Sequence, residues 1–289
     1  MLQITGKTCL TGLLGSPVAH SISPLMHNFS FEKLGINWVY LCFDVKEDGL
    51  KEAVQGLRAL QVKGFNLTMP NKNKILEYLD ELSPAARLIG AVNTVENRDG
   101  RLIGHNTDGV GFMQSVREQG IRMEGETMTL LGMGGAATAI CAQAALDQVG
   151  TIHVFARSGS RHRLRMEGLQ KALAKETACT IEFHDLKEPR ELREALTKSR
   201  LLVNATSVGM APDTEKCLIP DNSFLHEELA VADIIYNPWK TKLLCMAEQE
   251  GCKAFNGYSM LIWQGAEAFR IWTGQEMPVD QVRTYLKRQ

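Results

Sequence analysis

Leu130-Leu131-Gly132-Met133-Gly134-Gly135-Ala136-Ala137 stands near the middle of a chain of 289 residues. An apolar stretch at 128–131 precedes the glycines, and a run without proline or glycine follows them at 136–146. A strand, a glycine turn and a helix in this order are typical of a dinucleotide-binding unit. The glycines let the backbone approach a pyrophosphate, and the helix start offers unpaired N–H groups. These flanking elements make the pattern more specific than an isolated glycine turn.

The composition argues against several classes of partner. Lys and Arg number 32 and Asp and Glu 33, a balance that gives no electrostatic attraction for nucleic acid or an anionic membrane. No leader pattern opens the sequence, and no apolar run reaches membrane-spanning length. Seven scattered cysteines without a C-x-x-C pair predict reduced thiols, no disulfide framework and no metal site. We therefore expect a cytoplasmic protein that acts on a small molecule.

Apolar runs and helical patterns alternate along the chain, which is the signature of βαβ units. Strands are predicted at 9–14, 38–43, 65–67, 128–131, 151–155, 180–183, 201–203 and 231–235, and a hairpin pairs 91–95 with 101–105. Helices are predicted at 25–34, 50–60, 74–79, 108–119 and 259–272, with further starts at Pro84 and Pro278. The length suits two domains of about 150 residues each, and the boundary falls at the helix that starts at Asp108.

Polar side chains follow the N-terminal strands, at the edge of a parallel sheet where ligands bind. Ser21 and Ser23 come after the first strand, Lys72 after the third, and Asp108 after the hairpin. Hydroxyls, amides, one lysine and one aspartate at a single edge suit a small polyhydroxylated acid. Plainer interpretations stay open on these residues alone: a solvated lysine, an aspartate that caps a helix, and serines of an ordinary turn.

An ordered set of motifs resembles the shikimate dehydrogenase family, including its quinate/shikimate branch. Most of these motifs are weak singly, but the set runs from about residue 12 to about residue 275 and is specific as a whole. The motifs are His20-Ser21-Ile22-Ser23-Pro24, Asn66-Leu67-Thr68-Met69-Pro70-Asn71-Lys72, Gly90-Ala91-Val92-Asn93-Thr94, Asn106-Thr107-Asp108-Gly109, Gly132-Met133-Gly134-Gly135-Ala136, Asn204-Ala205-Thr206-Ser207-Val208-Gly209-Met210, Tyr236-Asn237-Pro238 and Gly257-Tyr258-Ser259-Met260-Leu261-Ile262-Trp263-Gln264.

This resemblance implies reversible reduction of 3-dehydroshikimate to shikimate with a nicotinamide cofactor. Lys72 and Asp108 match the family's catalytic pair, and Ser21 and Ser23 match the hydroxyls that grip the substrate carboxylate. The residues that match other groups lining the substrate are Thr68, Asn93, Tyr236 and Gln264.

A lysine beside a carboxylate suits this chemistry. Hydride transfer at a carbinol carbon needs a proton moved to or from its oxygen. The ammonium of Lys72 can donate to a developing alkoxide, and Asp108 can hold that ammonium in place. A close carboxylate favours the charged lysine and burial favours the neutral amine, so the sequence leaves the protonation state of Lys72 open.

The residues after the second Rossmann strand favour NADP over NAD. An acid there would bind the ribose 2′-hydroxyl of NAD, whereas this chain reads Ala156-Arg157-Ser158 with no carboxylate. Arg157 offers a planar cation to a 2′-phosphate, and Ser158 offers a hydroxyl. Family members often have asparagine in place of Ala156, some of the quinate/shikimate branch use NAD, and the arginines here also suit a solvated helix start. NAD therefore stays open as the cofactor.

Further cofactor contacts are expected from two other loops. The glycine turn would supply the pyrophosphate site, and the loop at 204–210 would support the nicotinamide, with Met210 and Gly257 assigned by resemblance alone. These residues are Gly132, Gly134, Gly135, Ala136, Thr206, Ser207, Met210 and Gly257. Tyr236 and Lys240 also fit the Y-x-x-x-K pattern of short-chain dehydrogenases, but the proline between them disfavours the helix that this pattern needs.

The expected architecture is two α/β domains with a cleft between them. Residues 1–106 with 257–289 would form the N-terminal α/β substrate-binding catalytic domain, and residues 107–256 the Rossmann-type NADP-binding domain. Two alternatives to the shikimate enzyme remain: a quinate/shikimate dehydrogenase of broader substrate and cofactor use, and a catalytically silent NADP-binding regulator. Monomer and homodimer both stay open. His20, His27 and His105 are interpreted as hydrogen-bonded structural residues.

Overall fold

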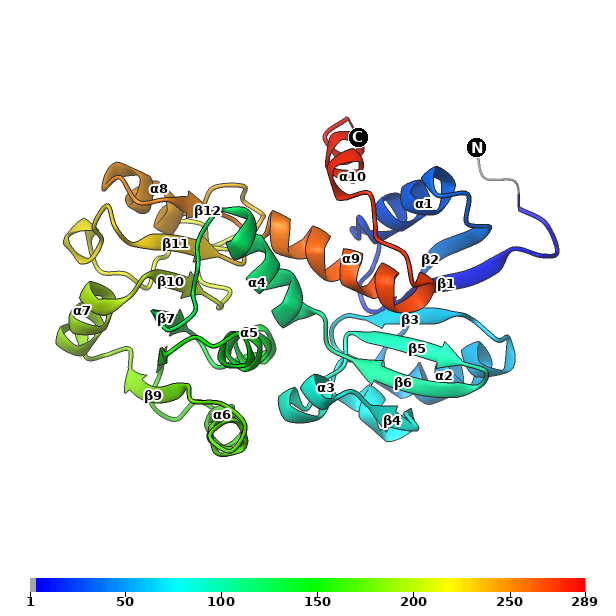
Figure 1. The fold of residues 1–289 in the computed structure, drawn as a ribbon, viewed down its shortest axis with the longest axis horizontal. Helices are drawn as coiled ribbons and strands as arrows, with labels where there is room; N and C mark the ends of the chain where they lie inside the picture. The colour runs from blue at the N-terminus through cyan, green and yellow to red at the C-terminus, as the bar shows by residue number, and fades with distance from the viewer. Residues whose placement is uncertain (1–3, 289) are drawn as a thin grey trace. The chain divides into compact units, whose positions relative to one another are not determined.

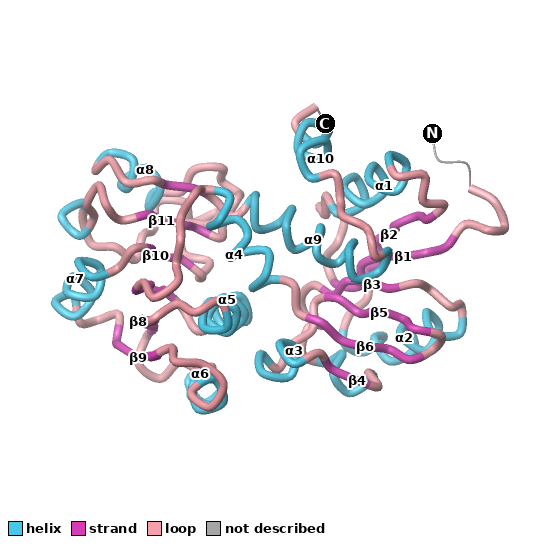
Figure 2. Tube along the Cα trace, in the orientation of Figure 1, coloured by secondary structure: helices cyan, strands magenta, loops and turns pink. Residues whose placement is uncertain are grey.

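The structure is a computed structural model that describes residues 4–288. The chain forms two compact units: the first ends at Gly111 and resumes at Ile262, and the second runs Phe112–Leu261. Figure 1 traces the chain through its elements, and Figure 2 marks the helices and strands of each unit. Among residues 4–288, every helix falls short of the length and apolar character that crossing a bilayer requires.

A six-stranded mixed sheet forms the centre of the first unit, in the order β2-β1-β3-β5-β6-β4. β1 pairs in parallel with β2 and β3, β5 pairs antiparallel with β3 and β6, and β4 pairs in parallel with β6. The strands are β1 (Cys9–Gly15), β2 (Trp38–Asp44), β3 (Gly64–Leu67), β4 (Glu81–Leu82), β5 (Thr94–Arg98) and β6 (Arg101–His105). The parallel trio confirms the βαβ prediction for this part of the chain.

Helices bury apolar side chains against this sheet. α2 contributes Leu50, Val54 and Leu57 to a core cluster that also holds Phe65 of β3. Elsewhere the rings of Phe31 in α1 and Phe269 in α9 pack at 5.2 Å between centroids. The helices are α1 (Ser23–Lys33), α2 (Leu50–Ala59), α3 (Pro84–Ile89), the later part of α9 (Tyr258–Thr273) and α10 (Val279–Leu286), with 3-10 turns η1 (Glu47–Gly49) and η2 (Lys74–Tyr78).

Two predicted elements of the first unit differ from the structure. The segment predicted as a helix at 74–79 is the 3-10 turn η2, and no side chain among residues 4–288 caps its start. The hairpin's first strand starts at Thr94 and not at 91, because the N–H of Val92 donates to the carbonyl of Lys72 at 2.9 Å. Ser83 caps α3 as expected: its Oγ accepts the N–H of Ala86 at 3.2 Å.

The second unit has a parallel six-stranded sheet in the order β12-β11-β10-β7-β8-β9. From β7 the chain proceeds through β8 to β9, then returns to the other side of β7 for β10, which makes the β7–β10 boundary the switch point of a doubly wound fold. The strands are β7 (Thr127–Leu131), β8 (Thr151–Ala156), β9 (Thr180–Asp185), β10 (Leu201–Asn204), β11 (Ala230–Asp233) and β12 (Ala254–Phe255).

The helices of the second unit alternate with its strands, as a Rossmann-type domain requires. They are the greater part of α4 (Asp108–Glu118), α5 (Gly135–Leu146), α6 (Arg163–Leu173), α7 (Pro189–Lys198), η3 (Asn222–Phe224) and α8 (Lys242–Gln249). The strand predicted at 231–235 ends at Asp233. Its carboxylate accepts the N–H of Ile235 at 3.0 Å, and this turn ends the strand.

Candidate functional site

Lys72 and Asp108 form an ion pair in the first unit. Lys72 Nζ lies 2.6 Å from Asp108 Oδ2, and the two side chains are 32% and 12% exposed. Lys72 follows β3 and Asp108 opens α4, so two chain segments that follow strands of the sheet are joined by this contact. The interpretation of Lys72 as a solvated side chain is therefore wrong. Asn106 Oδ1 accepts the N–H of Asp108 at 3.1 Å, which leaves the Asp108 carboxylate for Lys72 and its neighbours.

Asn93 fixes the second oxygen of this carboxylate. Its Nδ2 donates to Asp108 Oδ1 at 2.8 Å and to Thr107 Oγ1 at 2.9 Å, and Gln264 Oε1 of α9 lies 3.4 Å away. Its Oδ1 accepts the N–H of Thr107 at 2.8 Å. Asn93 is 2% exposed, so the amide has no water to compete with these partners. Both carboxylate oxygens of Asp108 are thus held in place from different directions.

A buried polar chain connects this pair to the predicted carboxylate site. Tyr40 Oη donates to Asn66 Oδ1 at 2.8 Å, and Asn66 Nδ2 donates to the carbonyl of Asn93 at 3.1 Å. A hydrogen bond from Ser23 reaches the Tyr40 hydroxyl, whose pKa burial raises well above its usual value. Tyr40 is fully buried, and nothing in its local sequence distinguishes it from a core aromatic, so its place in this polar chain could not be predicted.

The predicted substrate residues Ser21, Thr68 and Tyr236 lie in loops. Ser21 hydrogen-bonds the Cys42 thiol of β2, while burial raises that thiol's pKa. Thr68 follows β3, and its Cγ2 would lie 2.1 Å from a Cβ built on Gly15. Any side chain at position 15, at the end of β1, would therefore displace this threonine. Tyr236 follows β11 in the second unit, where it is 43% exposed.

The glycine turn lies at the switch point of the second unit. Gly132 has φ +112, and a Cβ there would lie 2.9 Å from Thr206 Cγ2, so this position requires glycine. Cβ atoms built on Gly134 and Gly135 would meet nothing within 4 Å. The first turn of α5 thus opens onto free space, which fits the pyrophosphate of a dinucleotide.

Thr206 is held by a buried network beneath this loop. Its Oγ1 donates to Asn204 Oδ1 at 2.7 Å, and Asn204 Nδ2 donates to Asp233 Oδ1 at 3.1 Å. Thr241 Oγ1 donates to the other Asp233 oxygen at 2.7 Å. Asp233 is 1% exposed, and its burial raises the pKa of the carboxyl. The loop after β10 is therefore anchored at its base, while Ser207 beside Thr206 is exposed.

A carboxylate does lie at the corner after β8, and the expectation of none there is wrong. Ser158 Oγ donates to Asp185 Oδ2 at 2.5 Å. Asp185 ends β9, whose register pairs it with Ala156. Hydrogen bonds from Ser158 and the Lys187 N–H hold the pKa of Asp185 below its usual value, so the carboxylate stays charged. Arg157 beside it is exposed.

Three further expectations concern residues of the second unit. Met210 is 46% exposed, so it is not a core methionine. A Cβ on Gly257 would lie 1.9 Å from the Ile234 carbonyl oxygen, which gives this glycine a packing role of its own. Residues 236–240 are not helical, and Lys240 pairs with Glu248 of α8, which confirms that the Y-x-x-x-K match is accidental.

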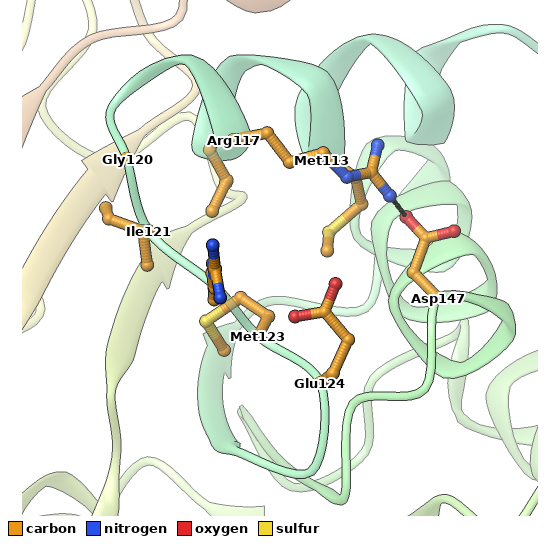
Figure 3. Close-up of a pocket in the computed structure, with 9 residues that line it drawn as sticks. Met113, Arg117, Gly120, Ile121, Met123, Glu124 and Asp147 are labelled. Atoms are coloured by element: carbon orange, nitrogen blue, oxygen red, sulfur yellow. Dashed lines mark hydrogen bonds and ion pairs between the residues drawn. The ribbon is translucent and has the colours of Figure 1, made fainter.

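A cavity of about 560 Å³ lies apart from all of the predicted site residues. Figure 3 shows the residues that line it. The end of α4, the loop that leads into β7 and Asp147 at the end of α5 surround it. Arg117 Nη2 and Asp147 Oδ2 form an ion pair of 2.5 Å across its rim. The cavity lies where β7 begins, whereas the glycine turn follows the carboxyl end of that strand, so the two are separate features.

Comparison with known proteins agrees with the fold. Models of the shikimate dehydrogenase substrate binding domain and of the shikimate 5′-dehydrogenase C-terminal domain match residues 13–95 and 257–285. The chain is 48% identical over 284 residues to a shikimate dehydrogenase (NADP(+)) of Listeria monocytogenes, covering 98% of this chain and 97% of that one. It is 44% identical over 288 residues to a quinate/shikimate dehydrogenase of Escherichia coli, covering 98% of each.

A solved structure extends the comparison from sequence to fold. Shikimate 5-dehydrogenase from Listeria monocytogenes, in complex with shikimate and NAD, matches this structure with a TM-score of 0.95 at 48% identity, covering 98% of each chain. An identity this high over nearly the full length of both chains confirms the resemblance seen in the motifs, and the chain belongs to the shikimate dehydrogenase family.

Proposed function

We propose that this protein is an oxidoreductase that reversibly reduces 3-dehydroshikimate to shikimate with NADP(H), in aromatic amino acid biosynthesis. The observation that carries the proposal is the Lys72–Asp108 pair, 2.6 Å apart and held by Asn93. A relative without catalytic activity would not require a lysine fixed in this way. The first unit would bind the substrate, and the second would bind the cofactor.

The bound nicotinamide supplies or accepts the hydride. Lys72 donates a proton to the carbonyl oxygen of 3-dehydroshikimate as that oxygen becomes a hydroxyl, and takes the proton back in the reverse direction. Asp108 holds the ammonium toward that oxygen and limits the side-chain entropy lost at each turnover. Because Asn93 occupies the second Asp108 oxygen, the carboxylate cannot rotate away from Lys72.

The substrate's own groups match the polar residues around this pair. Ser21 and Ser23 would receive the carboxylate of shikimate, while its ring hydroxyls would meet amide and hydroxyl side chains. Those side chains are Thr68, Asn93, Gln264 and, from the second unit, Tyr236. The chain from Ser23 through Tyr40 and Asn66 to Asn93 supports both ends of this set, so the carboxylate site and the catalytic pair would be positioned together.

The loops of the second unit fit the cofactor. Gly132, Gly134, Gly135 and Ala136 would receive the pyrophosphate at the start of α5. Arg157 would pair with a 2′-phosphate, next to Ala156 and Ser158. Thr206, Ser207, Met210 and Gly257 would lie toward the nicotinamide. The charged carboxylate of Asp185 beside Ser158 opposes a 2′-phosphate and suits a ribose hydroxyl, which favours measurable use of NAD as well.

A second candidate is a dehydrogenase active on both quinate and shikimate. The 44% identity to the quinate/shikimate dehydrogenase of Escherichia coli favours it, together with Asp185 at the cofactor corner. Quinate differs in the hydroxyl on the carbon that bears its carboxylate, so space beside Ser21 and Ser23 would decide the preference. Initial rates of nicotinamide reduction with each acid and each cofactor measure both choices directly.

The test of the main proposal adds one variant pair to these rates. Lys72→Met should lower kcat for shikimate about 10²–10⁴-fold, the usual range for loss of a general acid. Lys74→Met is the control, since Lys74 stands two residues away, pairs only with Glu77 among the ion pairs of residues 4–288, and should leave kcat unchanged. Wild-type kcat in Lys72→Met would overturn the assignment, and no turnover by the wild type with either acid would favour the silent regulator.

We further expect the enzyme to act in the cytoplasm on a free small molecule, without nucleic acid or membrane partners. The near balance of 32 basic and 33 acidic residues supports this. Light scattering after gel filtration distinguishes a monomer from a homodimer.

A further inference from the structure

Two histidines and a glutamate converge on one face of the β8–β9 strand pair. His153 of β8 is in register with Glu182 of β9, and His184 lies two residues further along β9 on the same face. His153 Nδ1 lies 3.2 Å from His184 Nε2 and 3.1 Å from Glu182 Oε2, and His184 Nε2 lies 3.7 Å from that oxygen. None of these residues takes part in the site described above.

The spacing of the three atoms matches that of ligands around a single ion. Tetrahedral zinc with bonds of about 2.0–2.2 Å places its ligand atoms about 3.4 Å apart. The observed separations of 3.1, 3.2 and 3.7 Å bracket this value. We propose that His153, His184 and Glu182 form a binding site for a zinc-class divalent transition metal ion.

The His184 ring is already oriented as a metal ligand, because its Nδ1 is held by a carboxylate outside the cluster. His184 Nδ1 lies 2.8 Å from Glu191 Oε2 of α7, and since a carboxylate only accepts, Nδ1 carries the proton. The lone pair of Nε2 therefore faces the cluster. In metal-bound histidines, the ring nitrogen that does not bind the metal usually donates its proton to a carboxylate in this way. Phe155, which is fully buried, stacks on the His184 ring at 4.6 Å and fixes its plane.

The charges around the cluster are also compatible with an ion. Lys198 of α7 opposes added positive charge, but Glu182 and Glu191 supply two negative charges. Without an ion, the Nδ1 proton of His153 would lie between Glu182 and His184. An ion takes that place when the neutral imidazole carries its proton on Nε2 instead, so binding changes the tautomer of His153 without a net release of protons.

The donor set and its exposure narrow the choice of ion. Imidazole nitrogens favour zinc, copper, nickel and cobalt, whereas calcium and magnesium prefer oxygen ligands. The His153 and His184 side chains are 12% and 19% exposed, and Glu182 is 49% exposed. An ion could enter from the glutamate side and keep a water as its fourth ligand. The sequence predicts no metal site because cysteine spacing carries no information on histidines from adjacent strands.

Isothermal titration of the chelator-treated full chain with zinc tests the site. We expect one ion per chain and a higher Tm with zinc than without it. Cobalt should show the visible absorption of a four-coordinate nitrogen and oxygen site, without thiolate charge-transfer bands. His184→Gln and Glu182→Gln should abolish binding, and Glu191→Gln should weaken it about 10–100-fold. His162→Gln, a histidine of the same unit outside the cluster, should bind as the wild type does.

Circular dichroism checks that the variants are folded, and each should give the wild-type spectrum in the metal-free state. No saturable binding up to about 1 mM zinc would overturn the proposal. So would unchanged affinity in the His153→Gln/His184→Gln double variant, or thiolate bands with cobalt, because either result would place the ion elsewhere.

Discussion

Asp185 and Arg157 would act in opposite directions on the 2′-phosphate of a bound NADP. Arg157 is an exposed cation at the end of β8, and Asp185 is a charged carboxylate bound to the neighbouring Ser158 at 2.5 Å. An arginine attracts a 2′-phosphate and a carboxylate repels it, so a single aspartate beside the phosphate would offset part of what the arginine contributes.

Asp185→Asn should raise the ratio of kcat/KM with NADP to that with NAD about 5–10-fold. The amide removes the repulsion of the 2′-phosphate and still accepts the Ser158 hydroxyl. Initial rates at saturating shikimate measure both values. Asp213→Asn, which removes an exposed carboxylate paired with Lys216, is the charge-matched control and should leave the ratio unchanged. A ratio that stays constant in Asp185→Asn would mean that this carboxylate does not face the cofactor.

The residues of the site differ in how far the sequence could identify them. Lys72 follows β3, Asp108 follows β6, and Asn93 precedes β5, which is antiparallel to both strands, so the mixed sheet brings all three to one edge. Asp185 could not be assigned to its corner because it comes 27 residues after Ser158, and only the β8–β9 register brings them together. Tyr40 was missed for a similar reason, since its partner Asn66 lies on β3 across β1.

At the scale of the elements, the strands and helices with a continuous pattern were predicted, whereas the helices α6, α7 and α8 and the two-residue strands were not. β1, β7 and α5 carry continuous apolar or helix-forming runs, and their ends fall within one or two residues of the prediction. β4 and β12 have two residues each, too few for any periodicity to show. They exist because β6 and β11 offer a free edge, which is a property of the sheet and not of these segments.

The start of α9 depends on a close backbone approach at Gly257. The Gly257 carbonyl accepts the N–H of Leu261 at 3.0 Å in the first turn of the helix, and its own N–H donates to the Ile235 carbonyl at 3.1 Å. A Cβ there would lie 1.9 Å from the Ile234 carbonyl oxygen and 2.4 Å from its carbon. Since backbone and not a flexible side chain stands in the way, the loop after β11 would have to move.

Gly257→Ala should therefore destabilise the second unit by about 2–3 kcal/mol. Gly168→Ala is the matched control in the same unit: it lies inside α6 with nothing within 4 Å of a built Cβ, and should stabilise by about 0.5–1 kcal/mol. Urea unfolding followed by circular dichroism measures both changes. Equal midpoints for Gly257→Ala and the wild type would contradict the close approach.

At the scale of the whole molecule, the two units have separate cores, and one of them contains a buried base. His27 of α1 is fully buried in the first unit, and within residues 4–288 neither of its ring nitrogens has a hydrogen-bond partner. The expectation of a hydrogen-bonded histidine is wrong here. Its ring stacks on Tyr40 at 4.4 Å and lies 5.3 Å from Trp272, so it is packed as an aromatic side chain.

This packing makes the stability of the first unit depend on pH. Burial lowers the pKa of His27 from 6.5 to about 3. Between these values the unfolded chain binds a proton that the folded unit excludes, so the contribution is fully retained above pH 6.5 and is lost as the pH falls. One proton corresponds to about 1.4 kcal/mol per pH unit, which gives a loss of about 2 kcal/mol between pH 7.5 and pH 5.

His27→Phe should remove this loss, because a phenyl ring can occupy the stack without titrating. The variant changes the absolute free energy of unfolding, so the readout is its slope with pH relative to the wild type. In a Trp239→Phe background the remaining tryptophans, Trp38, Trp263 and Trp272, all belong to the first unit. Urea unfolding followed by their fluorescence then reports that unit alone. Parallel slopes for the two proteins from pH 7.5 to pH 5 would contradict this prediction. They would show that His27 takes up its proton in the folded state, which would require water or a hydrogen-bond partner inside the buried stack.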